Sequence, residues 1–216
     1  MFVSAAEALE PATKSDRFES LLDHYDTGMV AGRGSKYFNI FNEFFNGYDD
    51  FNQLRMRLAA GLDVDHGLEV SSGQFDRTRM FYGNAFEALG SLVDLVAFAN
   101  NVLQGRDWNT FERLTVKQYL ELDKANRFNA FGNVPALAAL AGEADNQLRN
   151  ASHHGSMDID PVTKTITYRA GKGGQGEART ITYTDYLRRC VVLFGQILAL
   201  FSLEIVLAQH RRVQPF

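Results

Sequence analysis

Residues 148–155 hold the densest group of chemically reactive side chains in the chain. Arg149, Asn150, His153 and His154 all fall within six residues. A guanidinium can brace two phosphoryl oxygens at once, and an imidazole can take or give a proton near neutral pH. These residue types at this spacing therefore indicate chemistry on a phosphate ester.

A single helix is predicted to position this group. It should begin near Asn133, a plausible N-cap, with Pro135 in the first turn, and end at Gly155. Its apolar stripe consists of Leu137, Leu140, Ala141, Ala144 and Leu148. The polar group would then lie at the C-terminal end of the helix, where the helix dipole stabilises cations.

The residues alone leave two interpretations of this helix end open. Arginine and histidine in a last turn are ordinary C-terminal capping residues, and they are also suited to a catalytic pair. On an ideal helix Arg149 shares its face with His153, four residues along. His154 would join that face if the helix loosened near Gly155.

The segment Arg149-Asn150-x-x-x-His154 resembles the R-N-x-x-x-H form of the motif of the HEPN superfamily. The resemblance extends over about residues 75–216. It implies a helical bundle, usually a homodimer, with metal-independent endoribonuclease activity in many members of prokaryotic toxin–antitoxin and antiviral defence systems. The toxin branch with a tyrosine two residues after the histidine is not matched, because Ser156 stands there.

By this resemblance, Arg149 would stabilise the charge on the phosphorane and His154 would be the general acid or base. Asn150 would hold the geometry, and His153 would support the site. Carboxylates often orient a histidine, so Glu87 or Asp94, on the polar stripe of an earlier helix, could reach the motif. The alternative is that this polar stripe has no role in the site and simply faces solvent.

The charge of the chain is unevenly divided. The formal net charge is −4, but residues 146–216 carry nine Lys and Arg against five Asp and Glu, which leaves −8 on residues 1–145. A basic motif half is compatible with RNA as the partner.

Cys190 is the only cysteine, and the N-terminus lacks the pattern of a signal peptide, so a reducing, cytoplasmic location is expected.

The predicted fold class is all-α, a helical bundle with one β-hairpin before the last long helix. Residues 1–74 are expected to form a helical extension, and residues 75–216 a HEPN-like domain. The expected helices lie at about residues 15–25, 35–48, 50–60, 75–103, 115–126, 133–154 and 185–212, and the expected strands at 163–168 and 179–183. Ser15 or Asp16 is expected to cap the first helix, Ser35 the second, and Thr115 with Gln118 to form a capping box. The aromatic residues of the second helix are expected in the core or at an interface. The last helix is apolar, but Gln196 interrupts it and Glu204 follows, so no membrane span is predicted.

No cofactor and no metal are expected. Gly171, Gly173 and Gly176 match the dinucleotide-binding fingerprint, but a strand-like run follows them where that fingerprint needs a helix. The match therefore does not indicate a dinucleotide site, and a flexible hairpin tip is expected there. The favoured function is a metal-independent endoribonuclease of a toxin or anti-phage defence system, cleaving RNA by attack of its 2′-hydroxyl. An antitoxin or another defence protein would be a further partner. The alternatives are a non-catalytic nucleotide- or partner-binding module and a structural dimerisation unit.

Overall fold

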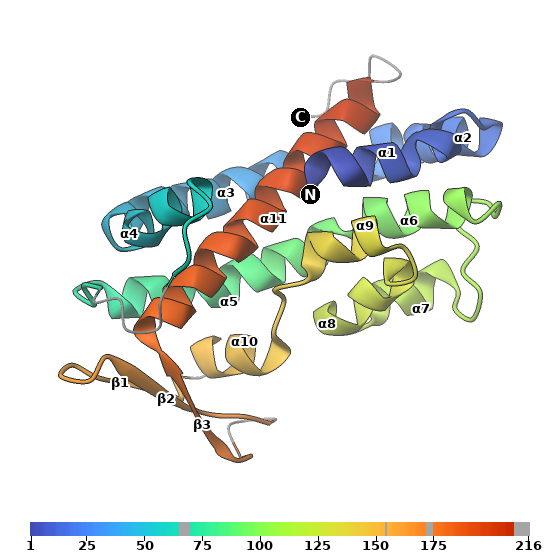
Figure 1. Ribbon diagram of the computed structural model, residues 1–216. Helices are drawn as coiled ribbons and strands as arrows, with labels where there is room; N and C mark the ends of the chain where they lie inside the picture. The colour runs from blue at the N-terminus through green and yellow to red at the C-terminus, as the bar shows by residue number, and fades with distance from the viewer. Residues whose placement is uncertain (65–69, 154, 172–174, 210–216) are drawn as a thin grey trace. The chain divides into compact units, whose positions relative to one another are not determined.

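The protein is mostly helical, as predicted. The computed structural model describes residues 1–64, 70–153, 155–171 and 175–209 (Figure 1). Helices make up 68% of it, and a small three-stranded antiparallel sheet accompanies them. His154 and the hairpin-tip residues 172–174 lie outside the described residues, so the predictions on them stay predictions.

The chain divides into two compact units that alternate along the sequence. Unit 1 comprises residues 1–38, 87–142 and 196–216, and unit 2 comprises residues 39–86 and 143–195. Three of the four boundaries fall inside helices, namely α3 (Arg33–Asn46), α5 (Phe75–Leu92) and α11 (Tyr183–Gln209), and the fourth lies between η3 (Ala139–Ala141) and α10 (Asn146–His153). The predicted division at residue 74 is not tested by these units.

Unit 1 is built from short helices around α6 (Asp94–Leu103), in which residues 95–102 are all buried. The other elements wholly in this unit are α1 (Phe2–Thr13), α2 (Asp16–His24), the π-helix η1 (Tyr25–Met29), α7 (Val116–Glu121), α8 (Lys124–Arg127), η2 (Phe128–Phe131), α9 (Pro135–Ala138) and η3 (Ala139–Ala141). Helices α1 and α2 both pack on α6. No helix was predicted before Ser15, so α1 was missed.

Two helix starts in unit 1 confirm the predicted caps. The hydroxyl of Ser15 accepts a hydrogen bond from Phe18 N at 3.3 Å at the start of α2. Thr115 and Gln118 form the predicted capping box at the start of α7. Helix α7 ends earlier than predicted, at Glu121, and α8 follows it as a separate turn.

A buried ionic cluster in unit 1 surrounds Glu204 of α11. This carboxylate is fully buried and accepts four hydrogen bonds, from Tyr25 Oη, Tyr37 Oη, Arg33 Nε and Arg33 Nη2, at 2.6–2.8 Å. Arg33 also donates to Asp94 Oδ1 and to the carbonyl of Leu92, both at 2.6 Å. Buried charges persist when they are paired and hydrogen-bonded in this way.

Unit 2 has an aromatic core. Phe44 stacks on Phe51 at 4.7 Å and on Phe194 at 3.7 Å between ring centroids, and Phe81 lies edge-on to it. These rings come from α3, α4 (Tyr48–Ala59), α5 and α11. Phe44 lies in the core, in line with the prediction of core or interface positions for the aromatic residues of α3, while Phe45 of the same helix is exposed.

The sheet of unit 2 contains the predicted hairpin and one further strand. Strands β2 (Thr165–Arg169) and β3 (Ala178–Thr182) pair antiparallel, with Ile166 opposite Ile181. Strand β1 (Met157–Asp160) was not predicted, and it pairs with the other edge of β2.

The prediction of one continuous motif helix over residues 133–154 is wrong. The segment forms α9, η3 and, after a break at residues 142–145, a separate helix α10 (Asn146–His153). Val134, not Asn133, is the N-cap of α9, with Pro135 at its first position. The predicted cap Ser35 is also wrong, because α3 already begins at Arg33.

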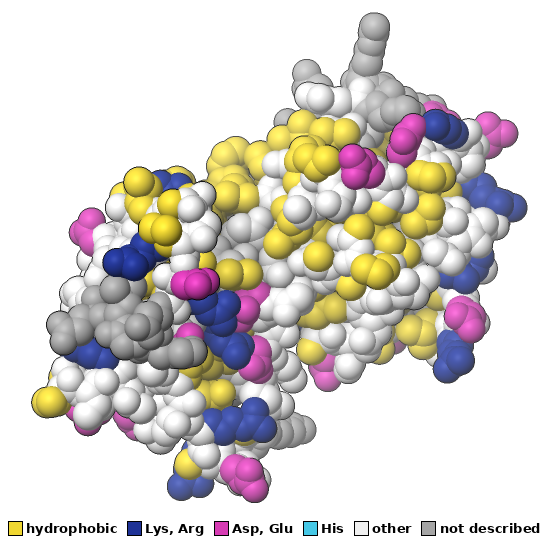
Figure 2. All heavy atoms as spheres, viewed as in Figure 1, with side chains coloured by type: hydrophobic (Ala, Val, Ile, Leu, Met, Phe, Trp, Pro, Cys, Tyr) yellow, Lys and Arg dark blue, Asp and Glu magenta, His cyan; other side chains and the backbone are white. Residues whose placement is uncertain are grey.

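Two described stretches are long and apolar enough to be candidate membrane spans. They are Phe75–Leu103 and Tyr183–Gln209, with 72% and 61% of their most apolar windows buried inside the protein. Core helices of soluble proteins pass the same test, so this is weak evidence for a span. Figure 2 shows apolar side chains interspersed with charged ones on the visible surface.

Candidate functional site

Helix α10 carries three of the four predicted motif residues, Arg149, Asn150 and His153. The carboxylate of Asp145 caps its start, accepting from Gln147 N at 2.8 Å and Leu148 N at 3.1 Å. The helix ends at His153, and Gly155 adopts a left-handed conformation with φ +65°. A glycine in that conformation is a common helix stop, so the predicted end is confirmed.

The start of α10 is anchored to two other helices of unit 2. Tyr82 of α5 donates to the carbonyl of Glu143 at 3.0 Å and accepts from Asp145 N at 3.1 Å. Arg189 of α11 donates to the carboxylates of Glu143 and Asp145, at 3.2 and 3.4 Å. Partial burial raises the pKa of the Glu143 carboxyl, which the charge of Arg189 opposes. These contacts fix the position of the motif helix within the unit.

The end of α10 is anchored by Arg79 of α5. Its Nη1 donates to the carbonyl of Ser152 at 2.7 Å, and the Ser152 hydroxyl donates to the carbonyl of Leu148 at 2.8 Å. Ser152 itself is buried, and its hydroxyl lies 3.3 Å from that of Tyr186. Arg79 therefore supplies part of the C-terminal capping of α10. The capping predicted from the sequence involved only residues of the helix itself.

Arg149 lies against an aromatic ring of α5. Its Cζ is 5.8 Å from the centroid of Phe86, within the range of a cation–π contact. Its Nη1 donates to Oδ1 of Asn150 at 2.6 Å. Burial lowers the pKa of the guanidinium from its usual value, although an arginine in a protein stays charged. A charged, partly desolvated guanidinium is suited to bind phosphoryl oxygens.

His153 contacts the same helix one turn earlier, at Gly83. A Cβ atom at position 83 would lie 2.8 Å from both Nε2 and Cδ2 of His153, so only glycine fits there without a shift. The Nε2 atom is buried and has no hydrogen-bond partner among the described residues. Buried polar atoms are usually paired, and exceptions are concentrated at functional sites.

Arg149 and His153 thus lie along one face of α10 and meet one face of α5, at Phe86 and Gly83. Arg79 joins them from the preceding turn of α5. Sequence reasoning missed Arg79 and Gly83, although their four-residue spacing, followed by Phe86, is a helical face. The arrangement brings two guanidiniums and an imidazole to the last turns of α10.

The other predicted site residues are His154, Glu87 and Asp94. His154 lies outside the described residues. Glu87 and Asp94 belong to unit 1, where Asp94 pairs with Arg33 at 2.6 Å and accepts from Leu95 N at 2.9 Å. Their predicted role in orienting a histidine stays a prediction. Among the described residues, no three His, Cys, Asp or Glu gather closely enough to hold a metal ion.

Comparisons of the chain with protein-family models, with curated proteins and with solved structures gave no match. The chemistry of this site must therefore be inferred from its own residues.

Proposed function

We propose that the protein is an endoribonuclease that cleaves RNA without a metal ion, with its reactive groups at the end of α10. The proposal rests on one observation. Arg149 and His153 contact a single face of α5, at Phe86 and Gly83. The HEPN-type helical bundle, and a place in a toxin or anti-phage defence system with an antitoxin or other protein partner, belong to the same proposal.

The proposed reaction uses the RNA 2′-hydroxyl as the nucleophile. One imidazole takes its proton as the oxygen attacks the adjacent phosphorus, and the bond from phosphorus to the 5′-oxygen breaks. The departing 5′-oxygen receives a proton, which leaves a 2′,3′-cyclic phosphate and a 5′-hydroxyl. Arg149 meets the charge that grows on the phosphoryl oxygens, where one preorganised donor is worth about 3 kcal/mol.

Either neighbouring histidine could be the essential one. The motif spacing favours His154, and the contact at Gly83 gives His153 a defined position beside Arg149. Purified His153→Ala and His154→Ala variants separate the two, because loss of the essential imidazole should lower cleavage by about 10²- to 10⁴-fold. RNA binding, measured by fluorescence anisotropy, should stay nearly unchanged.

The matched control is His24→Ala. His24 belongs to unit 1, where its ring stacks on Trp108 at 4.0 Å. This variant should retain full cleavage. Equal cleavage by wild type and both motif variants would contradict the proposal, and stable binding without any product would support a non-catalytic binding module instead.

We also propose that the active form is a homodimer. Apolar side chains of unit 1 remain exposed on α3 and α11, including Phe38, Leu198 and Val206. Burying such side chains against a second copy would be favourable, and a two-fold axis is the commonest symmetry of a homodimer. The proposed dimer would bring two Arg149–His154 sets to one cleft. Light scattering should report a dimer at micromolar concentration, and only monomer would count against this arrangement.

A further inference from the structure

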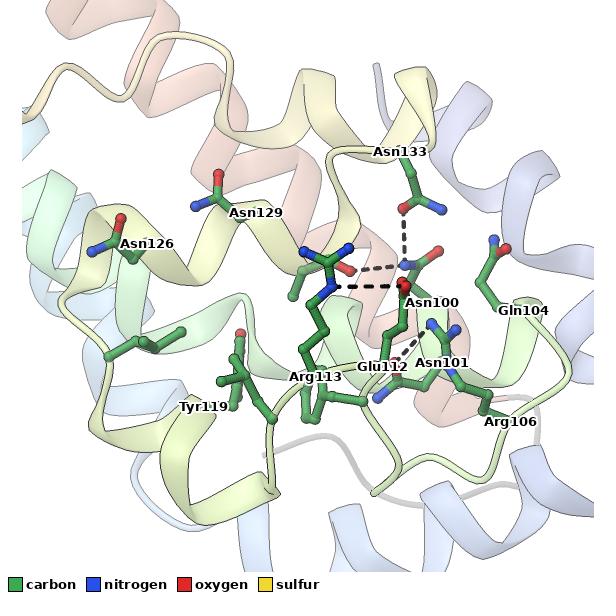
Figure 3. Close-up of a pocket in the computed structure, with 14 residues that line it drawn as sticks. Asn100, Asn101, Gln104, Arg106, Glu112, Arg113, Tyr119, Asn126, Asn129 and Asn133 are labelled. Carbon is green, nitrogen blue, oxygen red and sulfur yellow. Dashed lines mark hydrogen bonds and ion pairs between the residues drawn. The ribbon is translucent and has the colours of Figure 1, made fainter.

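Unit 1 contains a cavity of about 310 Å³ that is unusually rich in side-chain amides (Figure 3). It lies between α6, the loop after it, α7 and the turns that follow. The amides that line it are Asn100, Asn101, Gln104, Asn126, Asn129 and Asn133. Neither Arg149 nor His153 lines it, so it is separate from the proposed catalytic group.

Asn100 lines this cavity and has an unused hydrogen-bond acceptor. Its side chain is almost completely buried, and its Nδ2 donates to the carbonyl of Ala130 at 2.8 Å and to Oδ1 of Asn133 at 3.1 Å. Both N–H groups are thus used, which fixes the orientation of the amide. The remaining atom, Oδ1, is buried and has no hydrogen-bond partner within the described residues.

Tyr119 also lines the cavity, and its hydroxyl is buried like the Asn100 oxygen. Its ring is fully buried and stacks on Phe111 at 4.6 Å, and Arg127 lies 6.0 Å from its centroid. The packed ring holds the hydroxyl in place, and no described residue pairs with it. Burial raises the pKa of Tyr119, so the hydroxyl keeps its proton and can donate. Two unsatisfied buried polar groups at one cavity point to a ligand that satisfies both.

The charged residues that line the cavity are two arginines, Arg106 and Arg113, and one carboxylate, Glu112. Arg106 donates through Nη2 to Asn101 Oδ1 at 3.4 Å, and its Nε is buried without a partner in the described chain. Arg113 adds a second, exposed guanidinium, whose contact with the Glu112 carboxylate is a distant 3.9 Å. Guanidiniums beside hydrogen-bonding amides favour a ligand that has both an anionic group and a polar planar edge.

We propose that this cavity binds a purine mononucleotide with an adenine base. Adenine carries an amino N–H that the Asn100 oxygen can accept and ring nitrogens that can accept from the Tyr119 hydroxyl. Arg106, with Arg113, binds the phosphate. A neutral sugar would offer these guanidiniums no anionic group.

Calorimetric titration of the full chain with AMP tests the proposal. AMP should bind with one site per chain, and adenosine and inorganic phosphate should each bind at least tenfold more weakly. Absence of AMP binding at millimolar concentration would overturn the proposal. Adenosine binding as tight as that of AMP would overturn the role of the arginines.

Tyr119→Phe separates a ligand-binding role from a structural one. It removes only the unpaired hydroxyl and keeps the stacked ring, so the unfolding temperature should be unchanged or slightly higher. AMP affinity should fall about fivefold to tenfold, which corresponds to one lost hydrogen bond. The control Tyr48→Phe, in unit 2, should bind AMP like wild type. Unchanged AMP affinity in Tyr119→Phe would contradict the proposal.

Arg106→Gln tests the phosphate side of the same site. The loss of a charge-assisted contact should lower AMP affinity about tenfold or more while adenosine binding stays the same. The exposed residue Arg57 in unit 2 provides the control variant Arg57→Gln, which should change neither. Equal losses for AMP and adenosine would contradict the assignment of Arg106 to the phosphate.

Discussion

Two groups of charged residues in this protein, one in each unit, differ in how fully they are satisfied. In unit 1 the Glu204 carboxylate accepts four hydrogen bonds, and Arg33 donates to two carboxylates and a carbonyl. In unit 2 the Arg149 guanidinium lies over an aromatic ring, and the His153 Nε2 atom is buried without a described partner. The Glu204 carboxylate has little capacity left for a ligand, whereas the His153 Nε2 atom retains it. Burial of charge alone therefore does not identify a site, but incomplete satisfaction does.

The largest effect on stability is expected from breaking the unit 1 cluster. Glu204→Gln leaves the buried guanidinium of Arg33 without its main counter-charge, so the free energy of unfolding should fall by about 3–5 kcal/mol. Urea denaturation measures this loss. The control Glu10→Gln removes an exposed pair with Lys14 and should cause no measurable change. An equal loss in the free energy of unfolding in both variants would show that this cluster stabilises the protein no more than a surface ion pair does.

Arg149→Lys is expected to lower RNA cleavage strongly and to leave the free energy of unfolding nearly unchanged. An ammonium cannot reproduce the guanidinium fork, so RNA cleavage should fall about 100-fold. The free energy of unfolding should change by less than about 0.5 kcal/mol, because the side chain is only partly buried. Arg188→Lys, on α11, is the control and should affect neither cleavage nor stability. A large loss of stability in Arg149→Lys would make this residue structural, like Arg33.

A smaller effect is expected from Gly83→Ala, which tests the contact with His153. The added methyl group would overlap the imidazole, and such overpacking costs about 1–3 kcal/mol in the free energy of unfolding. In a His153→Ala background the same change should become neutral or stabilising. Gly195→Ala in α11 meets no atom within 4 Å and should stabilise the helix by roughly 0.5–1 kcal/mol. Identical effects of Gly83→Ala in both backgrounds would disprove the contact.

Local features of the fold could be predicted from the sequence. The Ser15 cap and the Thr115–Gln118 capping box depend only on neighbouring residues, and both are present. Strand β1 was missed because a four-residue strand gives too little alternation to recognise. The break before α10 was missed because its cause is tertiary. Asp145 both caps α10 and binds Tyr82 and Arg189, which are distant in the sequence.

The candidate site could be predicted only in part for the same reason. The motif itself is contiguous, so Arg149, Asn150 and His153 could be found by spacing. The residues of α5 that contact them, Arg79 and Gly83, are about 70 residues earlier in the chain. Their identity depends on how α5 and α10 pack, which no local pattern specifies.

The most direct test of the proposed chemistry is mass spectrometry of the RNA fragments that the purified protein produces in EDTA. Cleavage should persist in the chelator, spare DNA and leave 2′,3′-cyclic phosphate and 5′-hydroxyl ends, because the nucleophile comes from the RNA itself. Fragments with 5′-phosphate and 3′-hydroxyl ends, or complete inhibition by EDTA, would contradict the account.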